Sequence, residues 1–283
     1  MINTDVVDLS TGQVMENVSV ITERERDGLK TLREAKEKYL LKGAEISEKY
    51  KEYGEFVWLL YNVNQALDWG ITPDTLTRLI YISTYMTYDN KLVLPSGRSI
   101  RHKDLQKLLG VSERCCRTFW ESVTSAQIIT ESKEGCLYLN TALFHKGTMK
   151  KDISVYRMRL YINGIRSIYE ESSPREHKFL SYLFQAIPFV NCNYNMLCFN
   201  AAETNLNNVK AMQMKDYCEI IGYSPENDRR LKSTMKKLRI DDLPVFSFVD
   251  NADGLFCYVN PNVFYAGNKW DEVKVLGKFQ KEK

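Results

Sequence analysis

The segment from His102 to Gly147, HKDLQKLLGVSERCCRTFWESVTSAQIITESKEGCLYLNTALFHKG, decides the expected fold. Its leucines at 105, 108 and 109 follow a helical spacing that stops at Gly110. Ser112 is expected to begin a second helix, because a serine hydroxyl there accepts a hydrogen bond from a free backbone N–H of the first turn. Phe119 and Val123 mark the buried face of that helix. Two helices joined by a short turn are therefore predicted.

A β-hairpin is predicted directly after these helices. Apolar runs at 127–130 and 136–140 flank a polar turn at 131–135. The order of helix, tight turn, helix and hairpin is typical of a winged helix-turn-helix. The second helix of such a unit can enter a DNA major groove, and the hairpin can reach the backbone or the minor groove.

The same pattern occurs a second time. The sequence at 220–224 repeats that at 108–112 after 112 residues (224 − 112 = 112). Further matches pair Arg229 with Arg117, Leu231 with Phe119, Met235 with Val123 and Ile240 with Ile128. The segments 258–260 and 264–267 then match 138–140 and 144–147, now at an offset of 120 (264 − 144 = 120). We interpret the chain as a tandem duplication whose second hairpin is about eight residues longer.

The expected fold class is mainly α with small β-wings (α+β), as two winged-helix modules after a helical arm. The predicted parts are an N-terminal extension with a helical arm (1–71), a first winged-helix domain (72–150), a connector (151–173), a second winged-helix domain (174–268) and a polar C-terminal tail (269–283). Either a strand or a helix fits the connector. Residues 56–69 are expected to form a buried helix, and 200–210 form a polar insertion in the second module.

The arm is a candidate for dimerisation. Residues 21–53 have a charged, helical composition, and apolar residues occupy most positions of a three–four spacing that begins at Leu29. A homodimer through this helix is one interpretation, and a helix that packs on its own domain is the other.

Positive charge collects on the two predicted recognition units. The net charge of the whole chain is only +3. Residues 98–120 contain six Lys/Arg against two Asp/Glu, and residues 226–239 contain the same numbers (6 − 2 = +4 in each). Such a distribution favours nucleic acid as a partner.

The DNA-contacting residues are predicted from the faces of these helices. In the first module Ser112, Arg114, Arg117, Thr118 and Glu121 are expected to face the groove, with Arg101, Lys103 and Lys133 on phosphates. In the second module these are Asn227, Arg229, Arg230, Ser233 and Thr234, with Lys236 and Lys237 on the backbone. Arginine can bond guanine, and asparagine can bond adenine, each through two hydrogen bonds, so the helices can discriminate sequence.

The sequence offers no pattern typical of an enzyme. It has no G-x-x-x-x-G-K-[ST] loop, no H-x-H pair and no Ser/His/Asp arrangement, so neither catalysis nor a cofactor is expected. Its seven cysteines form no C-x-x-C pair, and its three histidines are scattered, so no metal site is expected. Cys115 and Cys116 are expected to be buried and inert. No secretory signal and no run of 18 apolar residues is present, so a cytoplasmic location without a membrane is expected.

The segments KDLQKLLGVSERCCRTFWESV with GCLYLN, and KDYCEIIGYSPENDRRLKSTM with GLFCYVN, resemble winged-helix DNA-binding proteins. The first segment looks like the DNA-binding part of replication initiators and regulators encoded by plasmids and phages of Gram-positive bacteria. The resemblance implies sequence-specific binding of double-stranded DNA, in transcriptional regulation or replication initiation. The alternative is a protein-interaction module that docks a partner or inhibits a host protein without specific DNA recognition.

Overall fold

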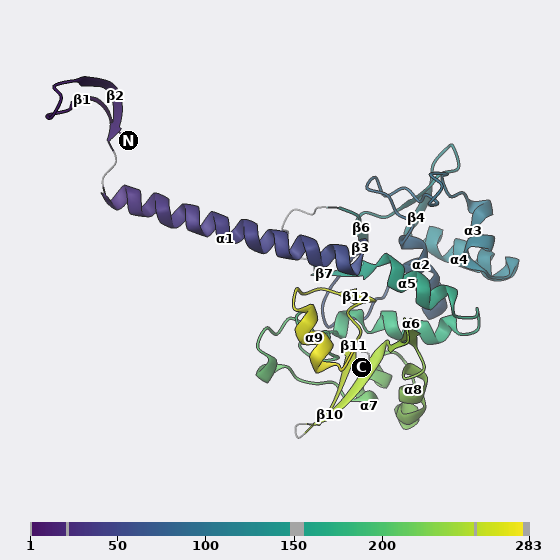
Figure 1. Ribbon diagram of the computed structural model, residues 1–283. Coiled ribbons are helices and arrows are strands. Elements are labelled where there is room, and N and C mark those ends of the chain that lie inside the picture. Colours follow the sequence, from purple (N-terminus) through teal and green to yellow (C-terminus); the bar gives the residue numbers. More distant parts are fainter. Residues whose placement is uncertain (1, 21–22, 148–155, 252–253, 280–283) are drawn as a thin grey trace. The chain divides into compact units, whose positions relative to one another are not determined.

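Helices and several small antiparallel sheets alternate along the chain, a mixed architecture that is compatible with the α+β class. The computed structural model describes residues 2–20, 23–147, 156–251 and 254–279 (Figure 1). The chain divides into two compact units, residues 1–52 and residues 53–283. The larger unit begins before the boundary at 72 that the sequence suggested, because a strand at 56–61 belongs to it.

The first unit contains one hairpin and most of one long helix. Strands β1 (Ile2–Val7) and β2 (Val14–Val20) pair antiparallel. The helix expected over 21–53 is present as α1 (Glu23–Tyr53) and continues through Gly43. Leu29 and Leu32 are exposed on it, whereas Tyr53 is buried within the second unit. The side chains at the other apolar positions of the expected seam lie outside the described residues, so dimerisation through α1 stays a prediction.

A four-stranded sheet in the order β12-β7-β3-β6 lies at the centre of the second unit. The two inner strands are β3 (Phe56–Tyr61) and β7 (Tyr156–Tyr161), and the two edges are β6 (Phe144–His145) and β12 (Phe264–Tyr265). The helix predicted over 56–69 is therefore wrong. Burial alternates at positions 57, 59 and 61, the two-residue period of a strand.

This sheet relates the two halves of the unit by an approximate twofold axis. Trp58 pairs with Arg159 at its centre, and the edge pairs Leu59–Phe144 and Leu160–Phe264 are equivalent on its two sides. Leu59 of β3 thus has its counterpart in Leu160 of β7, 101 residues later (160 − 59 = 101). The same offset separates Pro73, the first residue of the first helix of one half, from Pro174, three residues before the first helix of the other half.

The first helices of the two halves pack against each other across this axis. They are α2 (Pro73–Ser83) and α6 (His177–Gln185). The Thr77 hydroxyl on α2 donates to the His177 carbonyl on α6 at 2.9 Å. One continuous apolar core runs through both halves, so the second unit folds as a single body.

A buried arginine joins the sheet to the C-terminal segment. The Arg159 guanidinium, 3% exposed, donates to the carbonyls of Gly267 at 2.7 Å and Ala266 at 3.1 Å. Its charge also lies over the rings of Trp58 and Trp270, at 5.3 and 5.1 Å from their centroids. These contacts satisfy the buried charge and fix the chain at the twofold axis.

The predicted helix–turn–helix order is present in both halves. The first half has α3 (Leu105–Leu109) and α4 (Glu113–Ser125), and the second has α7 (Met214–Ile220) and α8 (Asp228–Met235). Gly110 and Gly222 adopt φ of +64° and +67° at equivalent turns. Glycine suits both positions, because a side chain strains this left-handed conformation.

A hairpin follows each second helix, but the expected alignment of Ile240 with Ile128 is wrong. In the first half β4 (Ile129–Glu131) pairs with β5 (Leu137–Leu139), and in the second β10 (Phe246–Asn251) pairs with β11 (Gly254–Val259). The Asn140 N–H donates to the Ile128 carbonyl, and the Asn260 N–H donates to the Val245 carbonyl. Val245 is therefore the equivalent of Ile128, at an offset of 117 (245 − 128 = 117).

The eight extra residues expected in the second hairpin (120 − 112 = 8) are thus divided between two places. Five residues (117 − 112 = 5) enter before Val245, where β8 (Arg239–Ile240) and β9 (Leu243–Pro244) form a separate small hairpin. Only three residues (120 − 117 = 3) lengthen the β10–β11 hairpin itself. Asp253, its expected tip, lies outside the described residues.

The connector and the tail both contribute to the core. Residues 156–170 of the expected connector form β7 and then α5 (Ile162–Glu170), so they contain both a strand and a helix. The tail contains α9 (Trp270–Leu276), whose Trp270 side chain is fully buried. Its indole N–H donates to the Tyr161 hydroxyl at 3.1 Å, and its ring stacks on Tyr53 at 5.2 Å. The tail was expected to be peripheral because its composition is polar, but its Trp270 is a large apolar residue that packs in the core.

Candidate nucleic-acid interface

Helix α4 has one buried face and one charged, exposed face. The Ser112 hydroxyl accepts a hydrogen bond from the Cys115 N–H at 3.4 Å, as the predicted N-cap does. Phe119 and Val123 are both 0% exposed and fix the rotation of the helix about its axis. The residues predicted to face a groove are all exposed, and they are Ser112, Arg114, Arg117, Thr118 and Glu121.

Helix α8 repeats this arrangement with a different start. Leu231 and Met235 are both 0% exposed, as Phe119 and Val123 are. A short 3-10 turn, Pro225–Asn227, precedes the helix, and the Ser224 hydroxyl makes no capping hydrogen bond. The predicted contact residues Asn227, Arg229, Arg230, Ser233, Lys236 and Lys237 are exposed, and Thr234 is half-buried.

The four arginines of these helices keep their charge available for a ligand. Among the described residues, no carboxylate lies within ion-pair distance of Arg114, Arg117, Arg229 or Arg230. Exposed guanidinium groups without an internal counter-ion attract anions most effectively.

The cations near the start of α3 differ in availability. Arg98 is paired with Asp104 at 3.0 Å, whereas Arg101 and Lys103 are exposed. Partial burial favours the neutral carboxyl of Asp104, but the Arg101 backbone N–H and the Arg98 charge outweigh it and hold the pKa below its usual value. Asp104 therefore stays ionised and pairs with Arg98, whereas Arg101 and Lys103 are exposed and form no ion pair among the described residues.

Two lysines of the second half make contacts that the sequence did not reveal. The ammonium groups of Lys232 and Lys236 lie 5.0 and 5.7 Å from the centroid of the Phe248 ring on β10. Such cation–π contacts hold both lysines between α8 and its hairpin. In the sequence, Phe248 is only an aromatic residue on a predicted strand, and its contact with the lysines of α8 follows from the tertiary packing.

The two hairpins carry little positive charge. Lys133 is exposed at the turn of the first hairpin, between the acidic residues Glu131 and Glu134. Within the described part of β10 and β11, the only charged side chain is that of Asp250. The cations of the interface therefore lie on the helices far more than on the hairpins.

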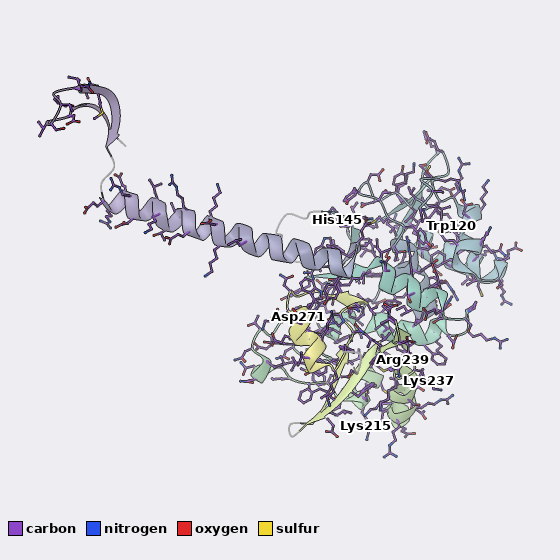
Figure 2. The ribbon with its side chains drawn as sticks, viewed as in Figure 1. Trp120, His145, Lys215, Lys237, Arg239 and Asp271 are labelled. Carbon is purple, nitrogen blue, oxygen red and sulfur yellow. The ribbon has the colours of Figure 1, made fainter. Side chains whose placement is uncertain are left out.

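An open cleft flanks α8. It has a volume of about 890 Å³ and lies between α8, α6 and the C-terminal end of α5. The predicted contact residues Arg230, Ser233, Thr234 and Lys237 line one wall, and Lys178, Phe179 and Tyr182 of α6 line the opposite wall. Figure 2 shows Lys237 and Arg239 at the C-terminal end of α8.

The neighbouring cysteines differ in environment. Cys116 is buried on α4, and burial raises the pKa of its thiol, which makes the reactive thiolate scarce. Cys115 is only half-buried, so the expectation that both are buried is wrong for this residue. In the described ranges, no three His, Cys, Asp or Glu side chains cluster as metal ligands would, and no helix is long and apolar enough to cross a membrane.

Comparisons of the chain with models of known protein families, with curated proteins and with solved structures gave no match. The functional argument therefore depends on the chemistry of the two helices and their surroundings.

Proposed function

We propose that the chain binds double-stranded DNA in a sequence-specific manner through two winged-helix modules, with α4 and α8 as recognition helices. One observation carries the proposal. Both helices bury an equivalent apolar pair and expose an equivalent arginine, Arg117 on α4 and Arg229 on α8. A duplicated anion-attracting helix after a tight turn suits two successive major grooves.

The approximate twofold axis supports a particular kind of DNA site. Recognition helices related by a twofold axis read half-sites in opposite orientation, because the symmetry of the site mirrors that of the protein. The two helices differ in sequence, since Glu226 stands at the position of Arg114 at the 112-residue offset (226 − 114 = 112). The proposed site is therefore an inverted pair of unequal half-sites about one helical turn apart.

Each class of exposed residue has a proposed role. Arg114, Arg117, Arg229 and Arg230 are proposed to contact base edges, which present distinct donor and acceptor patterns in the major groove. Arg101, Lys103, Lys133, Lys236 and Lys237 are proposed to contact phosphates, which position the protein without reading sequence. The proposed protein is cytoplasmic and non-enzymatic, and acts as a phage- or plasmid-type transcriptional regulator or replication initiator.

A salt titration of binding tests this division of roles. The full chain is titrated into a fluorescent mixed-sequence duplex at several salt concentrations, and the slope of log K against log salt is measured. Each phosphate contact contributes about −0.9 to that slope. We expect Lys236→Ala to make the slope shallower by about one contact, and Arg117→Ala to leave it almost unchanged. Equal slopes for both variants and the wild type would contradict the assignment.

A further inference from the structure

The cleft of about 890 Å³ beside α8 carries an excess of positive charge. Four cationic residues and two acidic ones line it (4 − 2 = +2), and the four are Lys178, Arg230, Lys237 and Arg239. All four are exposed, and none forms an ion pair with another described residue. Figure 2 shows two of them, Lys237 and Arg239, near each other after the end of α8. Such a cleft attracts an anion.

The two acidic residues of the cleft lie between α5 and α6. The Glu176 carboxylate accepts hydrogen bonds from the N–H and the hydroxyl of Ser173, at 2.8 and 2.7 Å, and Glu171 accepts one from the Ser167 hydroxyl at 2.8 Å. The Ser173 hydrogen bonds lower the pKa of Glu176, so this carboxylate stays ionised. Three of the four cations belong to the opposite wall, at α8 and just after it, so an anion is expected on that side.

The charge of this cleft is particular to the second half. Leu79 on α2 and Leu180 on α6 are both 0% exposed and mark the 101-residue offset of these helices (180 − 79 = 101). Three of the four cations stand where the first half has a neutral residue, and the pairs are Lys178 with Thr77 (178 − 77 = 101), Arg230 with Thr118 (230 − 118 = 112) and Lys237 with Ser125 (237 − 125 = 112). The shared fold therefore does not account for these charges.

Phe179 supplies an accessible aromatic ring next to these cations. It lines the same cleft and is 40% exposed. Tyr182 is only 5% exposed, with the Tyr223 ring against it at 5.7 Å, so its own ring is not available to a ligand. The counterpart of Phe179 in the first half is Arg78, which is buried (179 − 78 = 101). An exposed ring beside unpaired cations suits an unpaired base that carries a phosphate.

We propose that this cleft binds a nucleotide whose base is unpaired, either free or within a single strand. The base stacks on Phe179, which is possible for any base because every base has a π-face. The phosphate lies between Lys178 and Arg230, whose guanidinium can bond two phosphate oxygens. The exposed hydroxyl of Ser233, on the same wall as Arg230, donates a further hydrogen bond.

The proposed site does not depend on duplex binding, but one of its consequences does. Arg230 and Ser233 also belong to the proposed duplex surface, so a bound nucleotide displaces the duplex from the second half alone. This competition rests on the proposed function. Lys178 and Phe179, in contrast, lie outside the proposed duplex contacts, so their variants test the cleft by itself.

Fluorescence anisotropy of a labelled oligothymidylate, about four nucleotides long, tests the site with the full chain. We expect saturable binding that Phe179→Ala weakens roughly 5- to 150-fold, because it removes the stacking surface, and that Phe179→Tyr preserves. Lys178→Thr introduces the residue of the first half and should make the salt dependence shallower by about 0.7, the share of one phosphate of a single strand. The matched control is Lys215→Thr, which removes an exposed charge of α7 outside the cleft and leaves the salt dependence unchanged.

Unlabelled competitors identify the source of the nucleotide. If thymidine monophosphate competes as well as the unlabelled strand, the ligand is a free nucleotide, and if only the strand competes, the ligand is a single strand. An abasic strand of the same length has the phosphates without the bases. Equal competition by the abasic strand would overturn the proposal, because the cleft would then read charge alone, and this comparison needs no variant to fold.

Three other results would also overturn the proposal. They are no saturable binding, an unchanged affinity of Phe179→Ala, and equal changes in salt dependence for Lys178→Thr and Lys215→Thr when both keep the wild-type melting temperature. Titration of a labelled duplex separates the two proposals. Strand or nucleotide binding without duplex binding refutes the proposed function and leaves the cleft as a nucleotide site, whereas duplex binding without either refutes the cleft alone.

Discussion

Arg117→Ala and Arg229→Ala remove one equivalent arginine from each helix proposed to read DNA. Both residues are exposed and have no ion-pair partner among the described residues, so their loss leaves the fold intact. An arginine that bonds a guanine edge through two hydrogen bonds contributes about 1–3 kcal/mol to discrimination. At about 1.4 kcal/mol for each factor of ten, each variant is expected to bind its site roughly 5- to 150-fold more weakly.

The double variant tests whether the two arginines contribute to the binding free energy independently. The two arginines belong to different halves and share no contact, so their free-energy losses are expected to add, to about 2–6 kcal/mol. A loss much smaller than the sum would mean that one half already carries the binding.

Fluorescence anisotropy with the selected duplex, and with duplexes altered at one base pair at a time, measures these effects. Each single variant should lose discrimination at one base pair of one half-site and keep it elsewhere. Lys278→Ala is the control, because it removes an exposed positive charge outside both helices. An equal loss on every duplex would make the two arginines phosphate contacts, and no loss for either would refute the assignment of α4 and α8.

Three further predictions concern stability, measured as the free energy of unfolding in urea. Ser112→Ala should cost about 1 kcal/mol because its hydroxyl caps α4, while Ser224→Ala should cost almost nothing because its hydroxyl caps nothing; equal losses would contradict the cap. Burial and the nearby Arg78 charge lower the pKa of His177 to about 4. The unfolded chain therefore binds this proton first, and stability should fall by about 3 kcal/mol as the pH drops from about 6.5 to 4, a loss that His177→Phe removes; the same pH profile in the variant would contradict this. Trp270→Ala should lower the free energy of unfolding by about 3–5 kcal/mol because it leaves a large cavity in the core; a loss below about 1 kcal/mol would mean that α9 does not contribute to the core.

Local chemistry made the helix–turn–helix segments predictable from the sequence. Gly110 and Gly222 end their helices where a positive φ is needed, and Ser112 caps the next helix. The 3.6-residue spacing of Phe119 and Val123 also identified the buried face of α4 correctly. All these signals lie within a few residues of the feature that they specify.

Long-range pairing explains what the sequence did not reveal. The apolar run that begins at Phe56 fits a buried helix as well as a strand, and its partner β7 lies about a hundred residues away (159 − 58 = 101). Ile240 and Val245 are both apolar and buried, so either could be aligned with Ile128 until the backbone hydrogen bonds distinguished them. The cleft beside α8 and the Phe248 contact are formed by elements that are distant in the sequence and adjacent only in the fold.

The measurement that tests the central claim most directly is selection of duplexes from a random library by the full chain, at salt concentrations of about 50 and about 200 mM. We predict two short motifs of different sequence, opposite in orientation and about one helical turn apart, that persist at the higher salt concentration. Their position in the native DNA, upstream of a promoter or within origin repeats, distinguishes a regulator from an initiator. If the chain enriches no motif and its binding disappears at the higher salt concentration, the claim is contradicted, because counterion release alone would then explain the binding.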